Sequence, residues 1–587
     1  MNDRLAKLME CVKRNPHVRL ANRAIITRTN GYPNWREMLK PDQAEWEKAV
    51  SVAKSGKNVL VATSTGFYLA ATAIESLLAA AMTLRGANAH FLLCDGILPA
   101  CLNCDSSWYS NPKRFADSGP QTGLCKHCFA PAYKVLKSMG LTVHKYSDYL
   151  AAADYAKAES LGSSMSCEEI EHYRLEGLAV GEHALAGALR FFARATLDDE
   201  PTGEAVLRRY FKAALLTAYA MKRVITETRY DVALFHHGIY VPQGIIGEIA
   251  RRDNIRVVNW HPAYRKQRFI FSHDDTYHHT LMTEPVAKWE DVDLTEEREA
   301  EVVSYLKSRW KGTQDWIWFH EKPRFDIDFA KEIGLSPDKP CIGMLTNVMW
   351  DAQLHYPANA FPSMLDWVLE TIRYFAKRPD LQLVMRVHPA EIRGTLPSLQ
   401  PIVAEIEKAF PTLPDNVFVI PPESSISTYV AMQMCDSVII YGTKMGIELT
   451  SMGVPTIVAG EAWIRNKGVT MDASSKADYF RILDQLPLGS RLDRETVKRA
   501  RKYAYHFFFR RMIPLDIVSI QKVRDHLSFQ IQSKTPSLLD DLKPGRNKGL
   551  DVICNGILQG SDFIYPEESL DGLRGKTVLG CQSMLSK

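Results

Sequence analysis

The chain has 587 residues and a formal net charge of +4, with 46% hydrophobic and 24% charged residues. These values are typical of an ordinary globular protein and exclude a disordered or strongly charged chain. At about 100 to 200 residues per domain, the length fits three or four units, or two large α/β domains with insertions. A net charge this small gives no indication of a nucleic-acid partner.

The first residues and the longest apolar run both argue against membrane insertion. The first twenty residues carry a charge every few positions and hold no apolar core of a secretory signal. Residues 67–84 are largely apolar, but Glu75 lies at their centre, so they predict a buried helix and not a bilayer span. The eleven cysteines are odd in number and mostly scattered, unlike a secreted disulfide framework. We therefore expect a cytoplasmic protein, and leave open a peripheral association with the inner face of the cytoplasmic membrane.

The N-terminal half predicts a Rossmann-like domain with an insertion. Residues 1–55 are charged, have a helical pattern and lead into this domain, which we place at residues 56–282. Short apolar runs alternate with helical segments, the order found in parallel sheets. Residues 149–229 have helical spacing throughout and predict a helical insertion. The predicted strands are residues 58–63, 89–94, 231–235 and 255–260.

The C-terminal half predicts a second Rossmann-like domain. A charge-rich linker at residues 283–325 precedes it, the domain covers residues 326–530, and a weakly patterned appendage covers residues 531–587. The predicted fold class is therefore α/β, with two Rossmann-like domains and a cleft between them. Open α/β sheets bind ligands at the carboxyl ends of their strands, so we expect the site there. The predicted strands are residues 341–345, 381–387, 417–420, 437–440 and 456–458, with a helix at 363–376.

Four cysteines form the sharpest local pattern, inside a loop at residues 94–130. Cys101 and Cys104 are followed, after twenty residues, by Cys125 and Cys128. Two C-x2-C pairs at this separation are typical of a tetrahedral zinc site, and four thiolates would leave no position open for catalysis. The pattern therefore predicts a structural zinc ion. An iron–sulfur cluster or redox disulfides remain alternatives, because four cysteines alone do not fix the metal.

The segment 437–458 reads as a strand, a loop with Gly442, and a helix that begins near Lys444. The free N–H groups of residues 443–446 and the helix dipole would suit a phosphate. Glu448, about one turn inside the helix, could accept hydrogen bonds from ribose hydroxyls. The alternative is a plain βαβ turn in which Gly446 serves only close packing.

The strand at 381–387 ends in polar residues. The period of two places Arg386 and His388 on the same side, at the carboxyl end of the strand. A guanidinium and a ring N–H both suit an anionic leaving group. The alternative for His388 is a structural turn residue, because a proline follows it.

Several of these segments together resemble the GT-B glycosyltransferases of bacterial capsule and lipopolysaccharide biosynthesis. The resemblance covers roughly residues 231–470, with weaker support from 57–130. It implies a C-terminal nucleotide-sugar domain, an N-terminal acceptor domain, and transfer without a catalytic metal, with CMP-, UDP- and GDP-sugars all open as donors. The segments are 345–351, 386–389, 441–443, 446–448 and 453–455, and the donor-binding residues expected from them are Asn347, Arg386, Tyr441, Gly442, Thr443, Gly446 and Glu448.

On this resemblance, the catalytic base belongs to the first domain. His236 and His237 directly follow the strand at 231–235, and a neutral imidazole can take a proton from an acceptor hydroxyl. We expect His237 to be the base, with Asp95 as second choice, and His388 to act on the phosphate opposite. The alternative is that one histidine caps the strand and the other is exposed. A looser group, His261, His273, His278 and His279, lacks the regular spacing of metal ligands.

The expected function is transfer of a sugar from a nucleotide-sugar donor to a glycan acceptor, with inversion and with electrostatic stabilisation in place of a metal. A nucleotide-sugar 2-epimerase-like enzyme is the main alternative. A non-catalytic, zinc-dependent binding protein is the other. Nucleic acid is not an expected partner, because the segment 101–128 contains only Lys113, Arg114 and Lys126 as certain cations.

Overall fold

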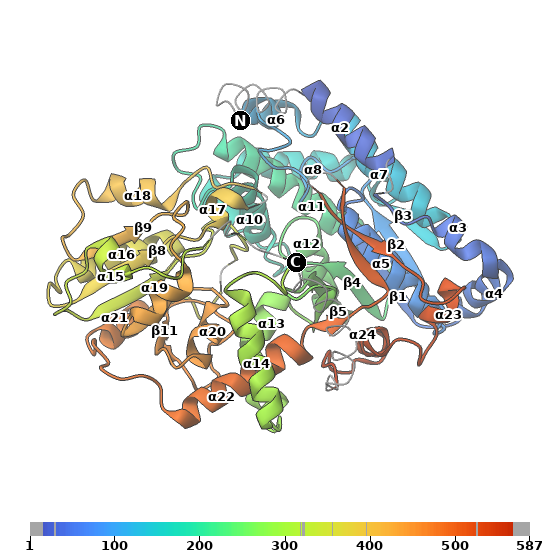
Figure 1. The fold of residues 1–587 in the computed structure, drawn as a ribbon. Coiled ribbons are helices and arrows are strands. Elements are labelled where there is room, and N and C mark those ends of the chain that lie inside the picture. The colour runs from blue at the N-terminus through green and yellow to red at the C-terminus, as the bar shows by residue number, and fades with distance from the viewer. Residues whose placement is uncertain are drawn as a thin grey trace, which may run out of the picture.

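The computed structural model describes residues 16–28, 31–316, 319, 323–354, 356–394, 396–523 and 526–566. The ends of the predicted lead-in and appendage, residues 1–15 and 567–587, lie outside this part of the chain. Two α/β domains lie side by side, and each is built on its own sheet (Figure 1). No helix in the described residues has both the length and the apolar character needed to cross a membrane.

The first sheet has seven strands in the order β13-β6-β5-β4-β1-β2-β3, of which β13 spans Ile513–Pro514. Its strands β1 to β5 are parallel, and their order 3-2-1-4-5 is that of a Rossmann fold. The direction of winding changes between β1 and β4, which defines the switch point of this sheet. The bounds are β1 (Asn58–Ser64), β2 (Asn88–Leu93), β3 (Thr142–Lys145), β4 (Val232–His236), β5 (Arg256–Pro262) and β6 (Arg268–His273).

Alternate residues of β1 face two different hydrophobic cores. Val59 and Val61 pack with α5, whose fifteen residues are all buried, whereas Leu60 and Ala62 pack with the helical insertion. The helices predicted at 67–84 and within 149–229 are therefore both present. On the first face lie α3 (Trp35–Leu39), α4 (Gln43–Ala53) and α5 (Leu69–Thr83), and the other helices of this half are α2 (Pro16–Arg28), α6 (Pro112–Ser118), α7 (Thr122–Lys137), α8 (Ala152–Ser164), α9 (Cys167–Glu171), α10 (Val180–Phe192), α11 (Gly203–Glu227), α12 (Gln243–Arg252) and α13 (Tyr277–Thr283).

The second sheet has six parallel strands in the order β12-β11-β10-β7-β8-β9. This is again the Rossmann order, and its switch point lies between β7 and β10. The strand bounds are β7 (Cys341–Leu345), β8 (Gln382–Arg386), β9 (Val417–Ile420), β10 (Ser437–Ile440), β11 (Thr456–Val458) and β12 (Met471–Asp472). The helices are α14 (Glu296–Arg309), α15 (Phe329–Ile333), α16 (Met364–Phe375), α17 (Ala390–Arg393), α18 (Ile402–Ala409), α19 (Thr428–Met434), α20 (Met445–Ser451), α21 (Lys476–Leu483) and α22 (Arg494–Tyr505).

After α22, which packs against α14, the chain returns to the first domain (Figure 1). The strand β13 (Ile513–Pro514) pairs with β6, and the hairpin β14 (Val518–Val523) and β15 (His526–Ile531) packs on α5. Two helices complete this return, α23 (Leu538–Leu542) and α24 (Lys548–Gln559). The boundary predicted at residue 530 therefore differs from the structure, because an apolar segment does not reveal locally which core it covers.

The cysteine loop does not take the arrangement that its spacing predicts. Cys101 and Cys104 form a tight turn, with the N–H of Cys104 donating to the carbonyl of Cys101 at 2.8 Å and the two sulfur atoms 3.8 Å apart. Cys125 and Cys128 instead lie in the first turns of α7. In the described part of the chain, no three His, Cys, Asp or Glu side chains are grouped to hold a metal ion. The predicted zinc site is thus not supported by the structure.

Candidate active site

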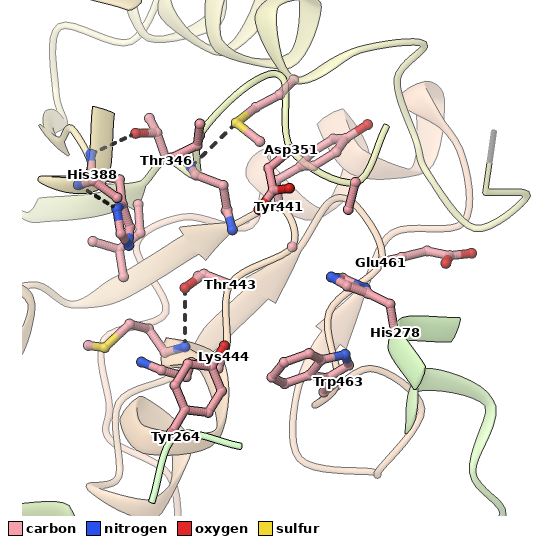
Figure 2. A pocket seen from close by; sticks show the side chains of 18 of the residues that line it. Tyr264, His278, Thr346, Asp351, His388, Tyr441, Thr443, Lys444, Glu461 and Trp463 are labelled. Atoms are coloured by element: carbon pink, nitrogen blue, oxygen red, sulfur yellow. Dashed lines mark hydrogen bonds between the residues drawn. The ribbon is translucent and has the colours of Figure 1, made fainter. Parts of the chain in front are cut away.

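A cavity of about 390 Å³ lies between the two domains. It opens at the carboxyl ends of both sheets, where the Rossmann order places ligands. The first domain contributes residues after β4 and β5 and from α13, and the second contributes loops after β7, β8, β10 and β11. Several of these side chains converge in Figure 2. Of the residues predicted from the sequence, the cavity wall contains Asn347, His237, Arg386, His388, Tyr441, Gly442 and Thr443, but not Asp95, Gly446 or Glu448.

His237 is held at the cavity by its backbone. Its φ is +67°, and its N–H donates to the carbonyl of Trp260 at 3.1 Å. The ring stacks on Tyr240, with centroids 5.1 Å apart and 25° between planes. Burial, and then the neighbouring His261 and His278, lower the pKa of His237 well below its usual range. The ring is therefore neutral near pH 7 and can accept a proton.

Two members of the looser histidine group also line the cavity, namely His261 and His278. Nδ1 of His261 lies 2.6 Å from the carbonyl oxygen of Pro262, so Nδ1 donates and the lone pair of the neutral ring is on Nε2. Burial lowers the pKa of His278 to about 4. The other two members are engaged elsewhere, because His279 contacts Asp275 and His273 contacts the carbonyl of Ser561.

Asp95, the second choice for the base, lies outside the cavity wall and accepts the N–H of Ser147 at 3.3 Å. The cavity instead contains Asp351, which our sequence reasoning did not single out. The hydroxyl of Tyr240 donates to Oδ1 of Asp351 at 2.8 Å and accepts the N–H of Ala352 at 2.9 Å, so this contact joins the two domains. The sequence signal that could have identified Asp351 is its position, as a polar residue in the loop after β7.

Arg386 and His388 both reach the cavity, in different ways. The guanidinium of Arg386 donates to the carbonyls of Pro421 and Ser424, and burial lowers its pKa to about 10. Arg386 thus also fixes the loop after β9. Nδ1 of His388 accepts the N–H of Ala390 at 3.0 Å, so the neutral ring carries its hydrogen on Nε2 (Figure 2). This nitrogen is a donor suited to an anion.

The turn after β10 is only partly open to a phosphate. The N–H of Met445 donates to Oγ1 of Thr443 at 3.3 Å, and the N–H of Gly446 donates to the carbonyl of Thr443 at 3.4 Å. A Cβ at Gly446 would lie 2.6 Å from Cγ2 of Ile464, so this glycine is needed for packing. The hydroxyl of Tyr441 is likewise engaged, donating to the carbonyl of Phe361 at 3.0 Å. Gly446 therefore follows the packing alternative.

Glu448 lies behind the cavity wall, at the centre of a buried ionic group. Its oxygens lie 3.1 Å from Nε of Arg309 and 3.2 Å from Nζ of Lys444, and the hydroxyl of Tyr429 donates to it at 2.6 Å. Burial alone would raise the pKa of Glu448, but Arg309 and Lys444 outweigh it and lower the pKa to about 2. Contact between Glu448 and a ribose stays a prediction. In this structure the carboxylate orients the two cations, both of which line the cavity.

The sequence reasoning missed these two cations as ligands. Lys444 lies four residues before Glu448, a spacing that favours ion pairs on helices, so it could have been found. Arg309 ends α14, in the segment expected to be a linker, and nothing local links it to the site. Asn347 was expected, and its Oδ1 is buried without a hydrogen-bond partner in the described structure. A buried amide oxygen without a partner is costly, so a ligand donor fits there.

No protein-family model and no curated protein matches the chain. Solved structures do match. Thermosulfurimonas dismutans KpsC, beta Kdo 2,4 transferase, is 14% identical, over 46% of this chain and 79% of that one, with a TM-score of 0.32. Thermosulfurimonas dismutans KpsC, beta Kdo 2,7 transferase, is 12% identical, over 53% of this chain and 85% of that one, with a TM-score of 0.30. UDP-GlcNAc 2-epimerase from Neisseria meningitidis, bound to UDP-GlcNAc, is 10% identical, over 76% of this chain and 94% of that one, with a TM-score of 0.21.

Two of these matched structures are thus named as Kdo transferases. At these TM-scores the likeness carries neither the fold nor the activity. The Rossmann order of both sheets establishes the architecture, and the side chains around the cavity indicate the chemistry.

Proposed function

We propose that the protein is a glycosyltransferase that moves a sugar from a nucleotide-sugar donor to a glycan acceptor in the biosynthesis of a bacterial capsule or lipopolysaccharide. One observation carries this proposal. A single cavity brings neutral imidazoles from the carboxyl end of the first sheet against cations and N–H donors from the second domain. Sugar transfer needs both, since a proton must leave the acceptor while a phosphate leaves the donor.

The second domain would bind the donor. Lys444, Arg309 and Nε2–H of His388 can stabilise the phosphate in the ground state, and more strongly as its negative charge grows during departure. This arrangement would serve in place of a catalytic metal. The further donor-binding residues in the proposal are Asn347, Arg386, Tyr441, Gly442, Thr443 and Glu448, the last acting through Lys444 and Arg309, whereas Gly446 serves the packing of the turn.

The first domain would activate the acceptor. His237 takes the proton of an acceptor hydroxyl as its oxygen bonds to the anomeric carbon and the bond from that carbon to the phosphate oxygen breaks. The electron pair of the broken bond remains on the phosphate. Attack from the face opposite the phosphate gives inversion. The proton on His237 then passes to water before the next turnover.

Nucleotide binding and sugar transfer can be tested in sequence. CMP, UDP and GDP are screened first by thermal shift, because a ligand at about 100 times its Kd adds about 2.7 kcal/mol of stability. The matching nucleotide-sugar is then incubated with and without a mixture of glycan acceptors, and the products are identified by mass spectrometry and NMR. We expect transfer only when acceptor is present. A donor that changes its stereochemistry without acceptor would indicate a 2-epimerase-like enzyme, and no stabilisation by any nucleotide would contradict the proposal.

A further inference from the structure

A carboxyl group lies buried behind the first-domain half of the cavity. Glu75 is at the centre of α5, among alanine, leucine, serine and threonine residues, and is 0% exposed. It does not line the cavity, and the proposed reaction does not use it. Burying a carboxyl group is costly unless it is hydrogen-bonded, so its partners indicate what it does.

The partners of Glu75 belong to the two strands that carry the cavity histidines. Nε1 of Trp260 in β5 donates to Oε1 of Glu75 at 3.0 Å. The other oxygen, Oε2, has no hydrogen-bond partner within the described residues, although the backbone of His236, the last residue of β4, is near enough to lower the pKa of the carboxyl group. His236 and Trp260 are register partners in the sheet, and the carbonyl of Trp260 accepts the N–H of His237. Through Trp260, the carboxyl group therefore connects α5 to the turn that presents His237.

The ring of His236 connects this carboxyl group to the cavity. It is 4% exposed, and neither of its nitrogens has a hydrogen-bond partner within the described residues. Its centroid lies 5.0 Å from that of Trp260 and 5.5 Å from those of both His237 and His261. The indole and the imidazole rings thus pack in series between Glu75 and the cavity.

The proposed reaction creates a positive charge in this group of rings. When His237 takes a proton, an imidazolium forms where burial already disfavours it, and the positive charge of Arg190 opposes it further. A negative charge on the far side of the rings would stabilise that state. Burial lowers the pKa of His261, and Asp351, on the cavity side, partly opposes this lowering. Glu75 is the carboxyl group on the opposite side of the rings, in the protein interior.

We propose that Glu75 is a positioning residue, which fixes the turn bearing His237 and supplies a negative charge behind the imidazole rings when they gain a proton. The catalytic part of this inference rests on the proposed function, whereas the coupling of Glu75 to Trp260 and His236 does not. Glu75 itself touches neither substrate.

The charge of Glu75 changes within the working pH range. Burial raises its pKa to about 7, although the hydrogen bond from Trp260 and the nearby polar groups of Thr63 and the His236 backbone oppose this rise. Two titratable groups face Glu75, namely Tyr68 at the start of α5 and His236 of β4. The positive charge of Arg190 in α10 lowers the pKa of both of these groups. Arg85, Asp551 and Cys554 gather around the opposite end of α5. Glu75 is therefore largely ionised above about pH 7 and neutral below it.

The first test needs no substrate. The protein is labelled with ¹⁵N-tryptophan, and the indole signal of Trp260 is identified as the one absent from Trp260→Phe. In the native protein we expect this signal to shift with pH, with a midpoint near 7, because its N–H donates directly to the titrating carboxyl group. In Glu75→Gln the same signal should be independent of pH. A signal that does not move between about pH 5 and pH 9 in the native protein would overturn the inference, even if Glu75→Gln fails to fold.

The second test uses turnover. Glu75→Gln keeps an oxygen for the indole and removes the charge, so we expect kcat to fall by about 10²-fold and its pH dependence near 7 to be lost, with KM for the donor unchanged. Glu171→Gln is the matched control, because burial also raises the pKa of Glu171 but α9 lies away from the cavity. Native kcat and an unchanged pH profile in Glu75→Gln would refute the charge role. Failure of transfer by the native protein would refute the proposed function and leave the indole titration to decide the coupling.

Discussion

Nζ of Lys444 lies 3.2 Å from Oε1 of Glu448, and their side chains are 19% and 0% exposed. The lysine reaches the cavity while the carboxylate stays behind it. Because Arg309 lies against the other oxygen of Glu448 and also pairs with the buried Asp315, buried negative charge orients two cations toward the place where a donor phosphate would lie. The ordering of these cations before the donor binds would reduce the entropic cost of binding.

Glu448→Gln should therefore weaken nucleotide binding although Glu448 is not in the cavity wall. Loss of the charge leaves Lys444 and Arg309 without their shared partner, and we expect the binding free energy to weaken by about 1 to 3 kcal/mol in calorimetry. The free energy of unfolding should fall too, by about 3 to 5 kcal/mol, because a buried ion pair is broken. Glu332→Gln, which removes a half-exposed partner of Arg324, is the control and should change both quantities little. Unchanged nucleotide affinity would exclude the orienting role.

His388→Ala should impair both donor binding and turnover. In the proposed complex its Nε2–H would donate to a charged phosphate in the ground state and to a more strongly charged one during departure, so kcat/KM should fall more than the affinity for the nucleotide alone. Steady-state kinetics and calorimetry on the same variant separate the two effects. His172→Ala, at the end of α9, serves as a remote control. A variant that binds and turns over like the native protein would make His388 a structural turn residue.

His237→Ala should lower turnover by about 10² to 10⁴ and leave nucleotide binding nearly unchanged, because a general base acts on the acceptor and not on the donor. The measurement is initial rate at saturating donor together with the nucleotide Kd. If turnover stays near the native value, the base lies elsewhere. His261 is then the first alternative in the structure, since its hydrogen bond to Pro262 leaves the lone pair on Nε2, followed by Asp95 and His236.

The stability of the protein should depend on Glu75 between about pH 4.3 and pH 7. Its folded pKa is about 7, above the value of about 4.3 for an unfolded glutamate, so in this window the folded chain binds more protons than the unfolded one. The contribution of Glu75 to the free energy of unfolding is therefore present at low pH and is lost as pH rises through 7. Urea unfolding should show that the free energy of unfolding decreases more steeply with pH in the native protein than in Glu75→Gln. Parallel pH profiles would place the pKa of Glu75 near its usual value.

The sequence by itself determined nine of the strands in the described residues, their alternation with helices and the place to look for a site, but not β3, β6 or β12 to β15. The predicted bounds of β7, β9, β10 and β11 agree with the structure, because a buried parallel strand is a short continuous apolar run between turns. His237, Arg386 and His388 were found because each comes at the end of such a strand, and the ends of parallel strands share one edge of a sheet. These are local signals.

Tertiary structure alone decided which distant groups meet at that edge. Arg309 comes from a segment expected to be a linker, the carboxyl group of Glu75 reaches Trp260 across 185 positions, and residues 513–566 return to the first domain. The cysteine spacing also suggested two metal-binding turns, whereas in the structure two of the four cysteines lie on the helix α7. Such pairings depend on how helices and loops pack over the sheets. A contact between two distant residues produces no periodic pattern in either segment, so residue spacing could not reveal these contacts.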